Sequence, residues 1–172
     1  RVFYTFSWSG GETAVADTWL WPGQRSGLGV LGVATDAIPG DARVTIKNIE
    51  WRRLDNRTYL DPAQFVTERL QFTVDEMVFV PANPNAGTSV HTISFILKNE
   101  TAFGYWQVPF TAIFKKGEVI VGSKQFIVDS FAAESIQKID LTSLVDSLDL
   151  DTVEVYANLN LFDEDNYLPL KK

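Results

Sequence analysis

Short runs in which hydrophobic and polar residues alternate dominate this chain, and turn residues separate one run from the next. Successive side chains of a β-strand point to opposite faces, so this alternation predicts strands with one buried face. The main runs cover residues 2–8, 44–51, 70–80, 91–97, 106–114, 119–128, 139–141 and 153–161, and a glycine-spaced apolar run covers 28–33. Many short strands with a turn every ~8–12 residues predict an all-β fold, either a β-sandwich or a barrel.

One run shows a break in its alternation. Val44 and Ile46 share one face, and Ile49 and Trp51 share a face, but the phase slips by one residue between the two pairs. A single extra residue in one strand produces such a slip, so we expect a β-bulge or a bend near Lys47.

Three other segments carry their own signals. Pro109 lies inside the alternation at 106–114, and because proline donates no ladder hydrogen bond it predicts a sheet edge or a bulge. The sequence Lys-Lys-Gly-Glu at 115–118 predicts a hairpin connection. Residues 142–150 are the only segment with a helical signal, and they predict a turn or a single helical turn.

The basic residues divide the chain into two parts. Seven arginines and one lysine lie between Arg1 and Arg69, whereas seven lysines and no arginine follow. We therefore expect a partial β-sandwich module at 1–56, a polar linker at 57–68, an immunoglobulin-like β-sandwich at 69–168 and a tail at 169–172. The second unit offers about seven strands in about 100 residues, the usual inventory of an immunoglobulin-like sandwich.

The first unit has too few strands for its aromatic content. About four strands bury little apolar area, and such small domains are marginal alone. Yet large rings need covering, and this unit carries Phe3, Tyr4, Phe6, Trp8, Trp19, Trp21 and Trp51. We expect the cover to come from upstream residues, from the second unit or from another chain. Because the chain opens at Arg1 with no signal-peptide pattern, we expect a processed or shortened chain whose first module lacks its opening strands.

Several segments resemble FxLYD-type immunoglobulin-like modules of bacterial and archaeal surface proteins. The run at 99–122 has the family's order: an Asn at a strand end, an aromatic-rich strand, a Gly turn and an apolar strand ending in Gly. Residues 153–163 look like the family's last strand, and 2–8, 21–24 and 44–51 look like later strands of a sister module. Phe114-Lys115 replaces the family's Tyr-Asp. The resemblance implies an exported β-sandwich and brings no active site with it.

Composition and charge exclude several classes of function. The 172 residues include 15 Lys and Arg against 22 Asp and Glu, a net charge of −7, with no Cys and one His. This inventory excludes disulfide scaffolds, zinc–cysteine sites and cysteine nucleophiles, and argues against nucleic-acid partners. No apolar stretch is long enough to span a membrane. We therefore expect no cofactor and no enzymatic activity, and we interpret His91 as a structural residue of its strand.

Four kinds of site residue remain as candidates. The alternating N-terminal strand offers an assembly strand through Val2, Tyr4, Phe6 and Trp8. Exposed aromatic residues are candidates for glycan stacking, namely Trp19, Trp21, Tyr105 and Trp106, with core packing as the alternative. Acidic residues at short spacing are calcium candidates, namely Asp149, Asp151 and Glu154, with solvated loops as the alternative. Two sequons make Asn56 and Asn99 candidates for N-glycosylation.

Together these features predict a non-catalytic extracellular protein of the cell surface. It would act as a spacer, an adhesin segment or a filament or pilus-like subunit, and its partners would be copies of itself or neighbouring modules of a longer chain. Exposed strand edges accept strands from other chains, so β-strand complementation between subunits is the expected mode of assembly. The alternative is a carbohydrate-binding module that uses exposed tryptophans, and an enzyme built on carboxylates ranks third.

Overall fold

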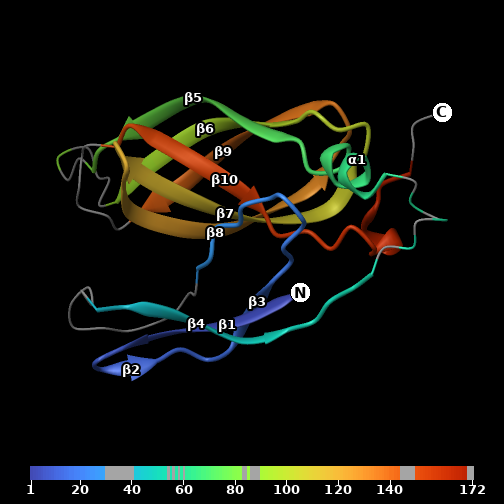
Figure 1. Cartoon of the computed structure of the whole chain (residues 1–172). Helices are drawn as coiled ribbons and strands as arrows, with labels where there is room; N and C mark the ends of the chain where they lie inside the picture. The colour runs from blue at the N-terminus through green and yellow to red at the C-terminus, as the bar shows by residue number, and fades with distance from the viewer. Residues whose placement is uncertain are drawn as a thin grey trace.

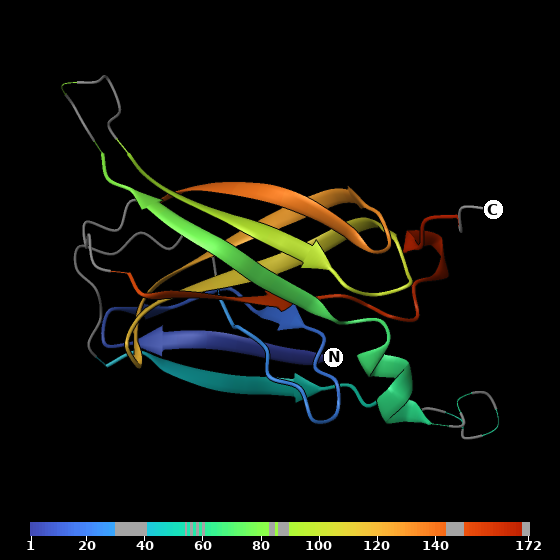
Figure 2. The ribbon, with the colours of Figure 1, turned by 90° about the horizontal axis from the view of Figure 1, so that it is seen from above.

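The computed structural model describes residues 1–29, 41–53, 55, 57, 59, 61–82, 85, 90–143 and 150–169. Nearly all of the regular structure in these residues is β-strand, which confirms the predicted all-β fold. Two three-stranded antiparallel sheets form a β-sandwich, and a smaller sheet made of N-terminal residues lies beside it (Figures 1 and 2).

The sandwich is built from the six described strands that follow residue 69. One sheet has the order β5-β6-β9 and the other has the order β10-β7-β8. The strands are β5 (Phe72–Val80), β6 (His91–Asn99), β7 (Tyr105–Lys116), β8 (Val119–Phe131), β9 (Ser135–Ser143) and β10 (Thr152–Ala157). Each prediction of a strand from alternation after residue 69 corresponds to one of these elements.

Alternation along the two central strands fills the core. β6 and β7 each have a neighbour on both sides and bury one set of alternating side chains, namely Ile93, Phe95, Leu97, Val108, Phe110, Ala112 and Phe114. Phe110 packs edge-on against Phe72 of the facing sheet, with 5.2 Å between ring centroids, and stacks on Phe126 at 5.3 Å. The two sheets therefore share one hydrophobic core.

The start of β7 departs from the simple alternation. The pattern placed Trp106 on the buried face, but Tyr105 is fully buried and Trp106 is 49% exposed. Opposite them in β8, between the pairs Tyr105↔Phe131 and Gln107↔Asp129, Ser130 has a positive φ of 51°. This local irregularity coincides with the exchange of buried and exposed positions.

The hairpin at 115–118 is where the sequence predicts it, but Pro109 lies in the central strand β7 and not in an edge strand or at a bulge. Pro109 pairs with Ile127 of β8, but on the other side of β7 the pairing with β10 ends at Phe110. The proline therefore lies just beyond the end of that ladder, a position that tolerates the missing N–H. Gly117 closes the β7–β8 hairpin with φ 55°.

The N-terminal sheet has β1 at its centre. β1 (Val2–Trp8) pairs on one side with β4 (Arg43–Ile49) and on the other with β2 (Gly11–Glu12) and β3 (Ala16–Thr18). The β1–β4 register shifts between Phe3↔Asn48 and Tyr4↔Ile46, which leaves Lys47 without a partner. The predicted bulge near Lys47 is confirmed.

The predicted linker contains a helix that belongs to the core. α1 (Pro62–Thr67) begins after Asp61, whose side chain accepts hydrogen bonds from the backbone N–H groups of Ala63 and Gln64. Pro62 at the first helical position completes a strong start signal that the prediction of a linker missed. Val66 is buried in the sandwich core. The C-terminal part of the predicted linker therefore packs against the sandwich and contributes to its core.

Two other predicted elements differ or lie outside the description. The helical turn expected at 142–150 begins inside β9, which runs to Ser143, and 144–149 lie outside the described residues. Of the strand expected at 28–33, Leu28 and Gly29 are not in a strand and the rest lies outside the described residues. A short 3-10 helix, η2 (Glu164–Asn166), lies near the C-terminus.

Residues 17–29 join the N-terminal sheet to the sandwich. Trp21 lies in the sandwich core and its indole N–H donates to the carbonyl of Leu159 over 3.2 Å. Gly27 lies so close to the outer face of β7 and β10 that an added Cβ would be 3.0 Å from Tyr156 and 3.2 Å from Thr111. The second unit thus supplies part of the cover that the N-terminal aromatic residues require.

Candidate functional site

The side of the N-terminal sheet that carries Tyr4 is apolar. Residues directly opposite each other in antiparallel strands point to the same face, and the pairs are Val2↔Ile49, Tyr4↔Ile46 and Phe6↔Val44. We call this set the N-terminal apolar face; it consists of Val2, Tyr4, Phe6, Val44, Ile46 and Ile49.

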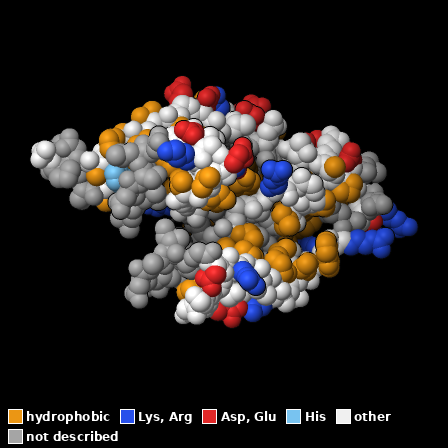
Figure 3. Space-filling view, turned by 60° about the vertical axis from the view of Figure 1, so that its left-hand side comes forward, with side chains coloured by type: hydrophobic (Ala, Val, Ile, Leu, Met, Phe, Trp, Pro, Cys, Tyr) orange, Lys and Arg blue, Asp and Glu red, His pale blue; other side chains and the backbone are white. Residues whose placement is uncertain are grey.

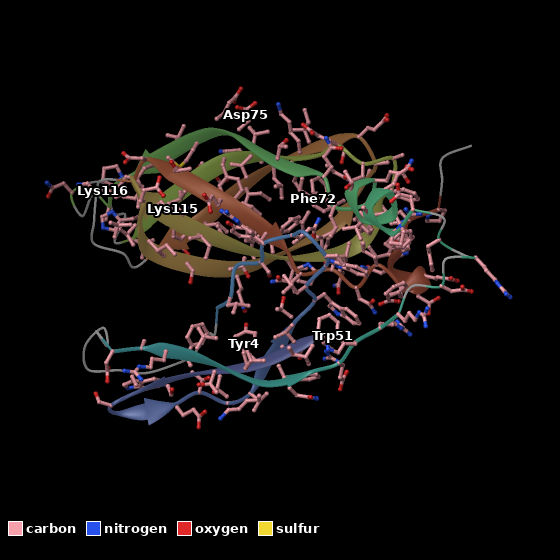
Figure 4. All side chains as sticks on the ribbon, in the orientation of Figure 1. Tyr4, Trp51, Phe72, Asp75, Lys115 and Lys116 are labelled. Atoms are coloured by element: carbon pink, nitrogen blue, oxygen red, sulfur yellow. The ribbon has the colours of Figure 1, made fainter. Side chains whose placement is uncertain are left out.

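Among the described residues, the cover of this face is most complete at Tyr4, and Val2 and Phe6 are partly buried. The Tyr4 ring is buried, its hydroxyl donates to the carbonyl of Gly29 over 3.1 Å, and burial raises its pKa. Gln125 of β8 donates to the same carbonyl over 3.0 Å, so Gly29 connects β1 to the sandwich. Figure 4 shows Tyr4 between β1 and the sandwich.

The β4 part of the same face is open. Val44, Ile46 and Ile49 are 45%, 49% and 43% exposed, and Trp51, just after β4, is 87% exposed. A hollow of about 630 Å³ lies between β3 and the sandwich, with Trp19 and Ile127 among its walls. In Figure 3 hydrophobic side chains of both bodies gather along the gap between the N-terminal sheet and the sandwich. Contiguous exposed apolar surface of this kind marks interaction sites.

In the described part of the N-terminal sheet, β4 forms one edge, and the short strands β2 and β3 form the other. Among the described residues, β4 pairs only with β1, and every one of its seven residues is exposed. Glu50 and Arg1 exchange both backbone hydrogen bonds, each 2.9 Å long. Since alternate residues of a strand turn their backbone groups to opposite edges, the N–H and C=O of Ile49 point away from β1. This edge offers backbone groups for an added strand.

The assembly strand predicted from the sequence needs correction. Val2, Tyr4, Phe6 and Trp8 belong to β1, which is the central strand and is paired within the chain on both edges. Trp8 also lies against the glycine turn that follows it, since a Cβ added at Gly10 would be 2.9 Å from its Nε1 atom. A central strand cannot accept another strand, so the candidate site moves to β4. The alternation of residues 44–51 can be seen in the sequence, but the exposure of this strand to solvent cannot.

The opposite face of the sheet is polar and internally paired. Lys47 and Thr5 both donate to the carboxylate of Glu12, over 2.7 Å and 2.6 Å. The Lys47 ammonium, followed by the Thr5 hydroxyl, holds the pKa of Glu12 below its ordinary value. Arg1 and Asp17 form a second ion pair of 2.6 Å. Two ion pairs thus lie on this face, whereas Val44, Ile46 and Ile49 on the N-terminal apolar face are nearly half exposed.

The four residues predicted to stack on glycans do not form a platform. Tyr105 is fully buried and its hydroxyl donates to the carbonyl of Arg69 over 2.7 Å. Trp21 is buried and stacks on Trp19 with 6.3 Å between centroids. Trp106 is exposed on β7 and is not in ring contact with either tryptophan. Core packing, the alternative for these residues, accounts for Tyr105 and Trp21.

The sequon at Asn99 is part of a buried turn. Its side-chain amide donates to the carbonyls of Phe103 and Ala132, each over 2.8 Å, and accepts from the N–H and hydroxyl of Thr101. Asn99 is 1% exposed, so its amide nitrogen cannot carry a glycan in the folded chain. The other candidate, Asn56, lies outside the described residues.

The calcium candidates that the structure describes are engaged by protein groups. Glu154 accepts from the Lys115 ammonium over 2.5 Å and from the Tyr156 hydroxyl over 2.6 Å, and both interactions lower its pKa. Asp151 accepts from the N–H of Gly117 over 2.8 Å. Asp149 lies outside the described residues, and within the described part no cluster of three His, Asp or Glu side chains is arranged to hold a metal.

His91 is held by its neighbours. Its Nδ1 accepts from the backbone N–H of Ala82 over 3.1 Å, and its ring stacks on Phe79 with 5.5 Å between centroids.

None of the helices in the described ranges has the length and hydrophobicity to cross a membrane. The chain matches no protein-family model, no curated protein and no solved structure.

Proposed function

We propose that this chain is a non-catalytic structural protein of the extracellular cell surface. It acts as a spacer, an adhesin segment or a filament subunit, and its N-terminal sheet is completed by a β-strand. That strand comes from a second copy of the chain or from a neighbouring module of a longer chain. The observation that carries the proposal is the exposed β4 strand, which is apolar on one face and pairs with no other described strand at its outer edge.

Burial of the N-terminal apolar face would stabilise such an assembly. Complete burial of a Val or Ile side chain contributes about 1.5–3 kcal/mol, so covering three half-exposed side chains contributes a few kcal/mol. Main-chain hydrogen bonds to the β4 edge would add affinity and set the register of the added strand. If the strand comes from elsewhere on an identical copy, the contact is head-to-tail and produces an open filament.

The experiment compares the wild-type chain with Ile46→Lys over a wide concentration range. We expect the wild type to form larger species as concentration rises, by light scattering and electron microscopy, and Ile46→Lys to shift this onset about tenfold or more, because a charge cannot be buried there unpaired. Val119→Lys is the matched control, since Val119 is also exposed but lies in the β7–β8 hairpin. Monodisperse wild-type particles at every concentration would contradict assembly between copies.

A further inference from the structure

A second surface feature, separate from the N-terminal apolar face, combines arginines with aromatic rings. A pocket of about 650 Å³ is bordered by the segment after β4, by α1 and by the C-terminal residues 161–168. Its aromatic wall is a cluster of rings: Phe65 and Phe162 stack with 6.1 Å between centroids, and Tyr59 meets both edge-on, at 4.6 Å and 6.1 Å.

The arginines of this pocket fall into two groups. Arg69 is structural: its guanidinium lies 4.1 Å from the ring centroids of both Phe65 and Phe103, and it donates to the carbonyl of Phe65 over 3.1 Å. Arg52 lies over the Phe162 ring, with its guanidinium carbon 4.7 Å from the ring centroid. Arg53 lines the pocket too, and among the described residues neither Arg52 nor Arg53 forms an ion pair or a hydrogen bond.

One carboxylate also lines the pocket without a partner. Within the described part of the chain, the Glu164 side chain makes no hydrogen bond or ion pair, although it borders the same pocket as the two free arginines. Asp55 lines the pocket as well, and its carboxylate already accepts from the N–H of Arg57 over 3.0 Å. The pocket therefore presents the guanidinium groups of Arg52 and Arg53, the Glu164 carboxylate and a set of ring faces to a single ligand. Unpaired guanidinium groups bind carboxylates strongly, because two parallel N–H groups match the two oxygens.

We infer that this pocket binds an acidic glycan, a sugar chain whose rings carry carboxylates and hydroxyls. The carboxylate would pair with Arg52 or Arg53, hydroxyls would donate to Glu164, and the apolar side of a sugar ring would lie on Phe162 or Tyr59. An acidic peptide fits less well, since several carboxylates close together would meet Glu164. Although the whole chain has a charge of −7, residues 52–69 carry four arginines against three carboxylates, so this stretch is not acidic.

The test is a titration with an oligomer of galacturonic acid, followed by calorimetry and by NMR shifts of the labelled chain. We expect saturable binding, with shifts at Tyr59 and Phe162. The double variant Arg52→Gln and Arg53→Gln should weaken binding about tenfold or more, as loss of charge-assisted hydrogen bonds does. Arg25→Gln is the control, because it removes an exposed arginine that lies outside this pocket.

Each other outcome overturns the inference. Equal binding of hexaglutamate would make the pocket a peptide site, and equal binding of a neutral glucose oligomer would remove the role of the arginines. Unchanged affinity in the double variant, or shifts confined to other residues, would place the ligand elsewhere. If the double variant unfolds, the NMR shifts of the wild-type chain test the inference, because binding at this pocket requires shifts at Tyr59 and Phe162. Light scattering of the same samples reports assembly separately, so failure here leaves the proposed function standing.

Discussion

At the scale of single residues, Asn99 shows how one side chain can hold a turn together. Asn99 is the last residue of β6. Its side-chain amide donates to one backbone carbonyl in the β6–β7 connection, that of Phe103, and to one in the β8–β9 connection, that of Ala132. Thr101 completes the arrangement by donating to the Asn99 side-chain oxygen. A residue that the sequence marks as a sequon is thus a buried hydrogen-bonding centre.

We predict that Asn99→Ala destabilises the chain by about 3 kcal/mol. The substitution removes the hydrogen bonds of the Asn99 side chain and leaves the buried N–H of Thr101 without its acceptor, and an unsatisfied buried group costs ~1–3 kcal/mol. The carbonyls of Phe103 and Ala132 each keep a hydroxyl donor, from Thr101 and Ser135. Denaturant unfolding followed by tryptophan fluorescence measures the loss. Gln137→Ala, at an exposed position of β9, is the control and should change stability little. A loss for Asn99→Ala no larger than that of the control would contradict this role.

At the scale of elements, β10 is attached to β7 by an ion pair as well as by its ladder. Lys115 and Glu154 meet over 2.5 Å, and the hydroxyl of Tyr156 donates to the same carboxylate. The pKa of Glu154 is lowered in the folded chain. Its contribution to stability is therefore complete above the ordinary value of 4.5 and is lost as the pH falls through the folded value.

We expect Glu154→Gln to reduce stability at pH 7 by about 1 kcal/mol or less, the usual range for a pair this exposed. At pH 3 the two proteins should differ less, because the wild-type carboxylate is then being protonated. Thermal unfolding at both pH values measures the difference. Glu118→Gln, in the exposed hairpin, serves as the comparison. A difference that grows as the pH falls would contradict this account.

At the scale of the whole molecule, the segment 17–29 holds the N-terminal sheet against the sandwich. Trp21 anchors one end in the core, Thr18 and Ser26 donate to the Asn158 side chain, and Gly27 lies tightly on β7 and β10. The sheet itself has little core, so its stability depends on this contact. Figure 2 shows the small sheet lying along one side of the sandwich.

We predict that Gly27→Ala loosens this contact, at a cost of about 1–3 kcal/mol, because its Cβ would lie within 3.3 Å of three side chains. Hydrogen exchange should become faster in β1 and β4 but not in β6 and β7. Gly29→Ala is a matched control, since a Cβ there has 3.6 Å to its nearest neighbour. Equal exchange in both variants would show that the segment does not hold the sheet.

How far sequence reasoning reaches differs between elements. Strands β6 and β7 were predictable because alternation reports burial of one face, and the bulge at Lys47 was predictable because a slip in phase has a single local cause. The helix α1 was missed although Asp61 and Pro62 signal its start, since a polar composition outweighed them. The alternation grouped Trp106 with the buried Val108, and the pattern gives no sign of the positive φ at Ser130 opposite Trp106.

The sequence alone determined that this chain is an all-β protein with an aromatic-rich N-terminal part, because the period of side-chain alternation is a property of the backbone. Only the tertiary structure decided which strand is central and which lies at the edge, since pairing partners come from distant residues. It placed β1 at the centre and β4 at the edge, and brought Arg52 and Arg53 beside Phe162. Both proposals rest on these juxtapositions, which depend on the contacts between distant segments.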